Sequence, residues 1–209
     1  DAINAARAAY DALTAEEQEQ VSNYDVLEAA EETYKGLLGD VVEIYDENGL
    51  REIAADGNYR LMSDIELKIP WSPVSDFSGT LDGNGHIISG IQISGAGFFA
   101  TTEEGAMIRN LGLEGSVNHT GFSPAGALVG RANGTTTITG CYTNVAVTAD
   151  SMENVGGIVG EARAACIIEN CYSLGTLTGG TSFAYAGGII GKNGSAETTV
   201  SNCYTTAAK

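Results

Sequence analysis

The chain has 209 residues and a formal net charge of −17, from 27 acidic and 10 basic side chains. Neither half of the chain has an excess of Lys and Arg, which disfavours nucleic acid as a partner because phosphates bind to basic faces. No apolar run approaches the roughly 20 residues that a membrane-spanning helix needs, and a start at Asp1 without a methionine indicates a piece of a longer protein.

Residues 1–38 have the pattern of three short helices. The run 14–17 is a capping box, in which Thr14 caps a new helix and Glu17 bonds back to it. A further helix is expected after Asn23, and its common face carries Leu27, Tyr34 and Leu38. An apolar stripe this thin is marginal alone, so the helices are expected to pack on one another or on the end of the following domain.

The run from Ala8 to Leu27 resembles small helical modules that recur in large cell-surface proteins of Gram-positive gut bacteria. Residues 1–38 are therefore predicted to be an N-terminal helical segment, and residues 39–209 a second domain.

The segment 40–68 is predicted to run strand, short helix, strand. Residues 41–45 form the first strand, Asp46 can cap a brief helix through Ala55, and β structure resumes over residues 59–67. Such a mixed segment would suit a cap, because the open end of a stack of β coils exposes unpaired backbone and apolar core.

From Gly95 to Tyr204 one short pattern returns four times at a nearly constant interval. Its first column consists of residues 97–100, 127–130, 157–160 and 188–191, and its second of 110–113, 140–143, 170–173 and 202–205. Within a copy, small or apolar residues alternate with polar ones, as expected for strands with one buried face. The pattern predicts a mainly β fold, a parallel β-helix in which each copy is one coil of about three short strands.

Three of the four cysteines share one column of the repeat. Cys141, Cys171 and Cys203 take the position of Leu111 in successive copies, which predicts a ladder of buried thiols acting as small apolar side chains. A disulfide between adjacent coils is the alternative. Cys166 has no cysteine partner in its column. Without a Cys-x-x-Cys spacing and with two histidines, neither a zinc site nor a redox pair is expected, and no cofactor is predicted.

Residues 59–67, 71–74 and 77–88, together with the repeats, resemble the GLUG-motif repeat proteins, named after the Gly-Leu-any-Gly core of each copy. The likeness spans about residues 40–209, and the first and last copies depart from it by placing Phe or Ile where the motif has Leu. The resemblance implies a right-handed β-helix of a secreted bacterial surface protein. Some such proteins are attached to immunoglobulin-cleaving metalloproteases and many to adhesin-like chains. The resemblance implies no reaction.

The run Asp82-Gly83-Asn84-Gly85-His86 is the first candidate site. A glycosidase or lyase needs paired carboxylates, or a base with a cation, and the candidates near the first coils are Asp64, Asp76 and Asp82. The structural interpretation is that Asp-Gly and Asn-Gly supply tight turns between strands. Calcium held by Asp82 and Asn84 is a further alternative, although a single Asp-x-Asn does not specify such a site.

A second column carries Tyr142, Tyr172 and Tyr204, each directly after a cysteine of the ladder and so on the opposite face of its strand. Outward aromatic side chains one coil apart would form a stripe able to stack a sugar or contact a protein, so these tyrosines are predicted ligand-binding residues. The alternative is that the helices of residues 1–38, or a loop, cover the stripe.

These observations favour a non-enzymatic extracellular module of a bacterial cell-surface or secreted protein. It would act as a structural spacer or as an adhesive face, with a host or cell-surface glycan or protein as partner. The alternative is a carbohydrate-active enzyme of the polysaccharide lyase or glycosidase type that uses the acids of the first coils.

Overall fold

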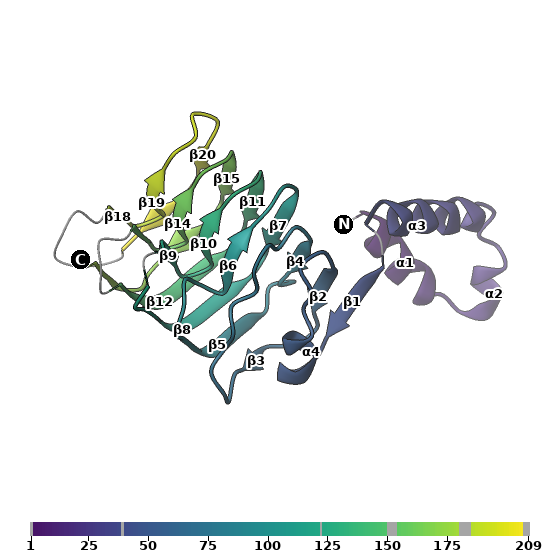
Figure 1. Cartoon of the computed structure of the whole chain (residues 1–209). Coiled ribbons are helices and arrows are strands. Elements are labelled where there is room, and N and C mark those ends of the chain that lie inside the picture. Colours follow the sequence, from purple (N-terminus) through teal and green to yellow (C-terminus); the bar gives the residue numbers. More distant parts are fainter. Residues whose placement is uncertain (1, 39, 122, 150–153, 180–184, 207–209) are drawn as a thin grey trace. The chain divides into compact units, whose positions relative to one another are not determined.

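The computed structural model describes residues 2–38, 40–121, 123–149, 154–179 and 185–206 (Figure 1). The chain divides into two compact units, Asp1–Val41 and Val42–Lys209, and each is described by itself. Within the described residues, none of the helices has the length and apolar character that a membrane crossing requires.

The first unit contains the three expected helices, α1 (Ala2–Asp11), α2 (Ala15–Gln18) and α3 (Tyr24–Leu38). The predicted capping box starts α2: the backbone N–H of Glu17 donates to the Thr14 hydroxyl, and the Glu17 carboxylate accepts from the Thr14 backbone at 2.8 Å. α1 and α3 pack against each other through the stacked rings of Tyr10 and Tyr24, whose centroids are 4.2 Å apart. The side chains of Tyr34 and Leu38 lie outside the described part of the chain.

The second unit opens with the predicted mixed segment. It consists of β1 (Val41–Ile44), α4 (Glu47–Arg51), β2 (Asn58–Leu61) and β3 (Ile65–Glu66). Asp46 caps α4, since its carboxylate accepts from the Gly49 backbone at 2.9 Å. The helix ends at Arg51, four residues earlier than expected. Ile44 and Leu50 are fully buried in the core, so this segment covers the first coil.

Four parallel sheets run along the second unit, one strand from each coil (Figure 1). Sheet A has the order β1-β2-β4-β7-β11-β15-β20, with β4 (Thr80–Asp82), β7 (Ala106–Arg109), β11 (Thr136–Thr139), β15 (Cys166–Glu169) and β20 (Thr199–Ser201). Sheet B has the order β3-β5-β8-β12-β16-β21, with β17 (Leu177–Thr178) also on β12; its strands are β5 (Ile87–Ile93), β8 (Gly112–His119), β12 (Tyr142–Ala149), β16 (Tyr172–Ser173) and β21 (Tyr204–Thr205).

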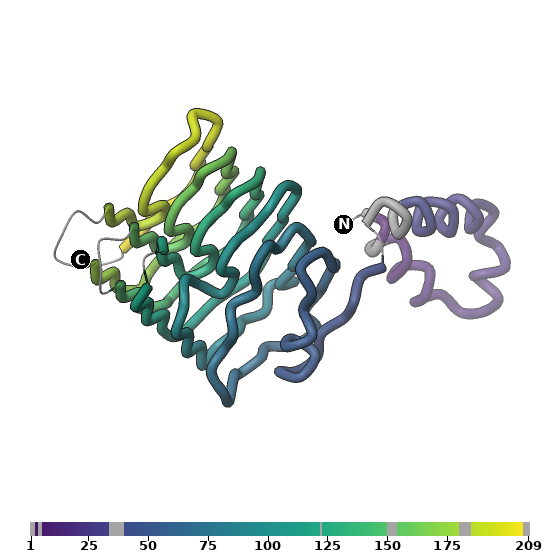
Figure 2. Tube along the Cα trace, viewed as in Figure 1, coloured from purple at the N-terminus to yellow at the C-terminus, as the bar shows by residue number. Residues whose placement is uncertain are grey.

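The other two sheets are narrower. Sheet C joins β6 (Phe99–Thr102), β10 (Val129–Ala132), β14 (Val159–Ala162) and β19 (Ile190–Asn193), and sheet D joins β9 (Ala125–Gly126), β13 (Val155–Gly156) and β18 (Ala186–Gly187). The four strands of sheet C mark about four turns of a β-solenoid, which confirms the predicted parallel architecture. Figure 2 follows the chain through these turns.

The coil from β9 to β12 contains four strands rather than the expected three, and in the next coil the strand of sheet B is divided into β16 and β17. The additional strand is the two-residue strand of sheet D, which lies two residues before the strand of sheet C. Glycine makes this tight bend possible: a Cβ on Gly156 would lie 1.8 Å from the Val159 carbonyl oxygen. In the sequence, the alternation of small or apolar residues with polar ones does not distinguish this two-residue strand from the strand of sheet C that follows it.

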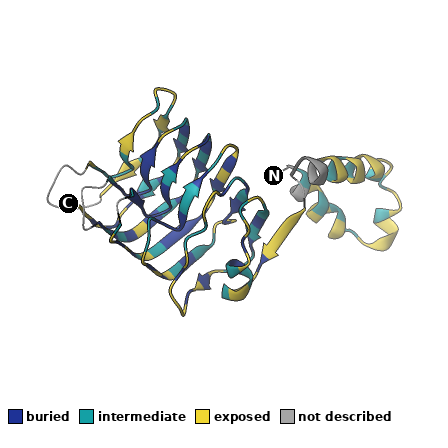
Figure 3. Cartoon of the chain, in the orientation of Figure 1, coloured by how far each residue is buried: buried dark blue, intermediate teal, exposed yellow. Residues whose placement is uncertain are grey.

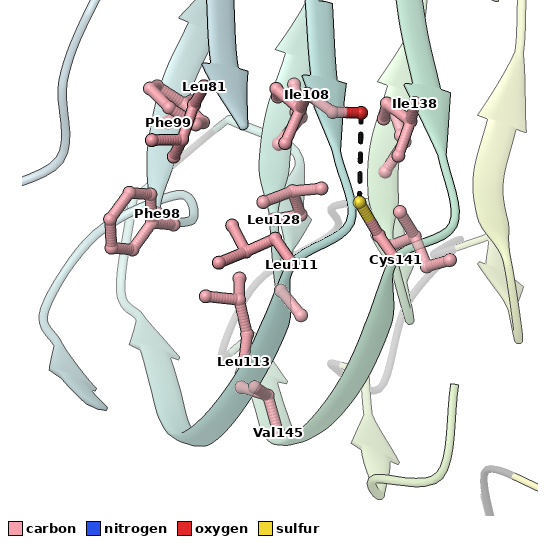
Figure 4. Packing of buried hydrophobic residues seen from close by; sticks show 14 of the residues in the cluster. Leu81, Phe98, Phe99, Ile108, Leu111, Leu113, Leu128, Ile138, Cys141 and Val145 are labelled. Atoms are coloured by element: carbon pink, nitrogen blue, oxygen red, sulfur yellow. Dashed lines mark hydrogen bonds between the residues drawn. The ribbon is translucent and has the colours of Figure 1, made fainter. Parts of the chain in front are cut away.

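Residues of successive coils stack in the register that the repeat predicts. Val129 pairs with Phe99 on one side and Val159 on the other, and Ile138 pairs with Ile108 and Ile168. These inward side chains have 0 % exposure, and Figure 4 shows Phe99, Ile108 and Ile138 among the packed residues of the core. The core is therefore one continuous column along the solenoid.

Candidate functional sites at the corner of sheets A and B

The corner between sheets A and B positions both the cysteine and the tyrosine columns. Asn110, Asn170 and Asn202 adopt φ values of 52°, 55° and 52°, and Gly140 takes the same place with φ 62°. Asparagine and glycine tolerate this left-handed conformation best. Because the chain turns here in every coil, the next residue points inward and the one after it points outward.

The inward residues form the predicted ladder of free thiols. Cys141 and Cys171 are 1 % exposed and Cys203 is half-buried, and all four cysteines are free. The backbone N–H of Cys141 donates to the Cys171 sulfur at 3.3 Å, and Figure 4 shows the Cys141 thiol donating to the Ile108 carbonyl. The hydrogen bond with Cys171, together with burial, raises the pKa of the Cys141 thiol, and burial raises that of Cys166 to about 12. A raised pKa keeps the buried Cys141 and Cys166 thiols protonated, whereas the hydrogen bond with Cys141 lowers the pKa of Cys171.

The outward residues form a tyrosine ladder, composed of Tyr142, Tyr172 and Tyr204. Neighbouring ring centroids are 5.2 and 5.1 Å apart, and the ring planes differ by 7°. Tyr142 leans over the preceding coil, where a Cβ on Gly112 would lie 2.4 Å from its ring. Its hydroxyl donates to the Glu114 carboxylate at 2.9 Å. Burial and this hydrogen bond raise the pKa of Tyr142 to about 12.

This geometry determines which parts of the rings a ligand can reach. Two rings that lie side by side in one plane cannot have their centroids about 5 Å apart, because their edge atoms would overlap. The tyrosine rings are therefore stacked, and each ring covers part of a face of its neighbour. Stacking of a sugar needs an open ring face. Tyr142 and Tyr172 are half-buried, whereas Tyr204 is 56 % exposed. The ladder therefore presents mainly ring edges and hydroxyl groups, with Tyr204 as its most open ring.

Asp82 ends strand β4 and is 7 % exposed. One carboxylate oxygen lies 3.1 Å from the Arg109 guanidinium and 3.6 Å from that of Arg60, and the other accepts from the backbone of Asn84 and the side chain of Asn110. A calcium ion would have to displace both arginines. The carboxylate already has the partners that a buried charge requires.

The tight turn predicted in the run from Asp82 to His86 begins at Asn84, two residues after Asp82. Asn84 and Gly85 have φ values of 52° and 83°, so Asn-Gly forms the tight turn, whereas Asp-Gly does not contribute a left-handed residue. Asp82 instead holds the turn through its bond to the Asn84 backbone.

The other two acids are exposed and have different partners. The Asp64 carboxylate accepts from the Ile87 backbone at 3.0 Å and lies 3.1 Å from His86 Nδ1; these hydrogen bonds lower the pKa of Asp64. Asp76 accepts from the Thr101 hydroxyl at 2.8 Å. Asp64 precedes a strand of sheet B, Asp76 contacts a strand of sheet C, and Asp82 belongs to sheet A. Nowhere in the described ranges do three or more His, Cys, Asp or Glu side chains gather in a metal-binding arrangement.

The helical unit has an apolar groove that sequence analysis did not anticipate. Its volume is about 580 Å³, and it is lined by Ile3, Ala6, Ala9, Tyr10, Leu13, Val21, Asn23, Tyr24, Val26, Leu27 and Ala30. Arg7 lies over the ring of Tyr24, one of the lining residues, and forms an ion pair with Glu31. The spacing of apolar residues predicted the helices, but the space left between them depends on their crossing.

Comparison with models of known protein families gives one match. The sequence model of the family described as the GLUG motif matches residues 153–178. This stretch includes the strands β13 to β17 of one coil. The chain is a β-solenoid that carries a GLUG motif. The neighbouring coils of this GLUG solenoid stack on the matched coil in parallel register.

The remaining comparisons are less informative. No curated protein matches the chain. Among solved structures, the chain is similar to one named a putative immunoglobulin A1 protease from Bacteroides ovatus, with 17 % sequence identity and a TM-score of 0.44. The similarity covers 79 % of this chain and 75 % of that one.

A charge cluster on sheet C of the GLUG solenoid was also missed from the sequence. Glu161 is 6 % exposed and lies 3.1 to 3.2 Å from cationic groups of Arg131, Arg163 and Lys192. Burial alone would raise the pKa of Glu161, but the bonds from Lys192 and Arg131 outweigh it and lower the value. The signal was present, because Arg131, Glu161 and Lys192 share one repeat column.

Proposed function

We propose that this chain is a non-enzymatic extracellular module of a bacterial surface or secreted protein, and that its GLUG solenoid is a structural spacer. The observation that carries the proposal is the parallel pairing of successive coils around one continuous core. In such a stack each coil adds a constant length, and its contacts are repeated from coil to coil. The GLUG motif and the acidity of the chain support an extracellular setting.

The acids of the first coils support a structural role. Asp82 is neutralised by two arginines, Asp64 caps the Ile87 backbone, and Asp76 bonds to a threonine. A glycosidase requires two carboxylates about 5 to 9.5 Å apart, one on each side of the scissile bond. Instead, Asp82 holds the turn at Asn84, Asp64 accepts from the first backbone N–H of β5, and Asp76 accepts from a side chain of β6.

Insertion of whole coils tests the spacer role. A copy of residues 127–156 placed after Gly156 continues the repeat in phase, since Gly157 is the counterpart of Ala127. Each copy should lengthen the solenoid by about 4.8 Å, so three copies should add about 14 Å to the maximum dimension from small-angle X-ray scattering. The far-ultraviolet circular dichroism per residue should stay β-like, and unfolding should stay cooperative.

The matched control is an insertion of the same residues in scrambled order, which should not extend the folded stack. Failure of the in-phase insertion to lengthen the particle would contradict the spacer role. Release of reducing ends or unsaturated products from a polysaccharide panel would contradict the non-enzymatic role, provided that Asp64→Asn, Asp76→Asn or Asp82→Asn abolishes it.

The tyrosine ladder supports a second candidate function, an adhesive face. Its hydroxyl groups and ring edges are aligned one coil apart on the outer side of sheet B, and exposure increases toward Tyr204. This arrangement suits a glycan or protein that accepts hydrogen bonds from a row of hydroxyls. It suits a sugar stacked flat on the inner rings less well.

A glycan array and a protein-binding screen test this candidate with two triple variants of Tyr142, Tyr172 and Tyr204. Replacement by Phe keeps the stacked rings and removes the hydroxyls, whereas replacement by Ala removes both. Binding through hydroxyls should be lost in both variants. Binding that survives the Ala variant would remove the ladder from consideration.

A further inference from the structure

The basic side chains of the second half of the chain gather at one place on sheet C. Residues 111–208 contain three Lys or Arg side chains, which are Arg131, Arg163 and Lys192. They come from three successive coils, and each lies 3.1 to 3.2 Å from the carboxylate of Glu161. We call these four residues the Glu161 cluster. The fold therefore concentrates every Lys and Arg of this long stretch around a single acid.

The Glu161 cluster contains more positive charge than its carboxylate requires. Glu161 is 6 % exposed, and one bonded cation is enough to pair a buried carboxylate. Three cations and one carboxylate leave two positive charges in excess. Within the described residues no second acid pairs with any of these cations. Since the chain as a whole has a net charge of −17, neutralising Glu161 does not account for a local excess of the opposite sign.

The two arginines have hydrogen-bond donors to spare, and these donors are held in position. Arg131 and Arg163 both donate from Nε to the same carboxylate oxygen of Glu161, at 3.1 and 3.2 Å, so their guanidinium groups are neighbours. No atom of the described residues accepts a hydrogen bond from their Nη groups. A guanidinium is a rigid fork of five N–H donors that matches the oxygens of a carboxylate or a sulfate. Glu161 therefore orients two unoccupied forks.

The donors can be reached from solvent. The side chains of Arg131, Arg163 and Lys192 are 24, 55 and 46 % exposed, whereas that of Glu161 beneath them is 8 % exposed. Figure 3 shows β14, the strand that carries Glu161, buried along its length. Both arginines belong to coils with a paired coil on each side, because β10 pairs with β6 and β14, and β14 with β10 and β19. Their surroundings therefore do not depend on how the stack ends.

Acids mark one limit of the positive surface. In the coil before Arg131, Thr101 takes the same position in the column, and its hydroxyl donates to Asp76. Beside it, the Asn133 side chain donates to Glu103 of that same earlier coil. The positive surface is thus confined to the coils of β10, β14 and β19. A small cationic site on an acidic chain suits a short ligand with separated negative groups, because a long polyanion such as nucleic acid would be repelled by the rest of the molecule.

We propose that the Glu161 cluster binds a carboxylate or sulfate group of an acidic glycan. The Nη groups of Arg131 and Arg163 donate to the oxyanion, and Lys192 adds attraction by its charge. Glu161 contacts the arginines and not the ligand, so it is a positioning residue. The choice of a glycan rests on the extracellular setting proposed above. The site lies on sheet C and is separate from the tyrosine ladder of sheet B.

Nuclear magnetic resonance titration of the whole chain tests the proposal, at about 50 mM salt, where screening is weak. The acidic probes are a tetramer of galacturonic acid and a sulfated tetramer of galactose, and the neutral probe is the unmodified galactose tetramer. An acidic probe should shift the backbone amides of residues 131, 161, 163 and 192 and leave those of β11 and β15 in place. The neutral tetramer should shift none of them. The acidic probe that binds more tightly identifies the anionic group.

Two variants with the same loss of charge separate this site from general electrostatic attraction. Arg163→Gln removes one fork, while Glu161 keeps two cations, and it should weaken binding at least about tenfold. Lys68→Gln is the matched control, because Lys68 lies before these coils with its side chain 68 % exposed, and it should leave the affinity within about twofold. Circular dichroism establishes that both variants are folded.

Three results would overturn the proposal. The first is a wild type whose amides in the Glu161 cluster respond to neither acidic tetramer, and the second is an affinity that Arg163→Gln does not lower more than Lys68→Gln does. The third is tighter binding of a tetraglutamate peptide than of either acidic tetramer, which would make the ligand an acidic peptide. The spacer role is measured by scattering of the coil-insertion variants, so each of these results leaves it standing.

Discussion

At the residue scale, glycines determine how closely the chain can bend back on itself. Gly156 lies between β13 and β14, where a Cβ would meet backbone atoms at 1.8 and 2.5 Å. Gly49 in α4 has space, because its nearest atom outside the helix backbone would be 3.5 Å away. Two glycines of similar appearance in the sequence therefore have different structural importance.

Replacement by alanine tests this difference. Gly156→Ala should destabilise the solenoid by about 3 kcal/mol, because the methyl group forces backbone atoms apart in a packed coil. Gly49→Ala should be neutral or stabilise by about 0.5 kcal/mol, since alanine is favoured within a helix. Urea unfolding followed by circular dichroism measures both. Equal effects of the two substitutions would contradict the steric argument.

The turn at the start of the solenoid shows what residue patterns predict. Asn84-Gly85 was recognised as a turn because these residue types tolerate positive φ. The partners of Asp82 were not recognised, since Arg60 and Arg109 lie 22 and 27 residues away in the sequence and meet it only when coils stack. Arg163, which joins the Glu161 cluster from outside its column, is in contrast two residues from Glu161 in the sequence.

At the scale of elements, the cap and the coils have different origins in the sequence. Each coil repeats a pattern, so its strands could be predicted from their copies. The cap segment occurs once, and its helix α4 was predicted from Asp46 as N-cap but ends earlier than expected. Leu50 is the side chain of α4 that enters the core.

Leu50→Ala tests whether the cap stabilises the solenoid. Loss of a fully buried leucine should cost about 2 to 5 kcal/mol, and the loss should lower the urea midpoint of the whole second unit. Ile69→Ala is the control, because Ile69 is 58 % exposed and its truncation should change stability by less than about 0.5 kcal/mol. Local fraying of α4 with an unchanged midpoint for the coils would contradict a capping role.

At the scale of the whole molecule, a stack of coils has two ends and a constant middle. Contacts are repeated along the middle, so each coil buries the previous one, and stability is a sum over neighbouring coils. The ends break this repetition. The cap with Leu50 covers the first coil. The proposed spacer role depends on the middle.

The amino-acid sequence alone determined the period, the columns and the inward or outward direction of each column. It could do so because parallel stacking places a residue directly over its counterpart, and strands alternate their side chains. Cys141, Cys171 and the three tyrosines were placed correctly for this reason.

The tertiary structure decided what the outward side chains meet. The overlap of tyrosine ring faces, the ion pairs of Asp82 and the three cations around Glu161 depend on side-chain conformations and on the angle at each corner. Residue spacing contains no information about either.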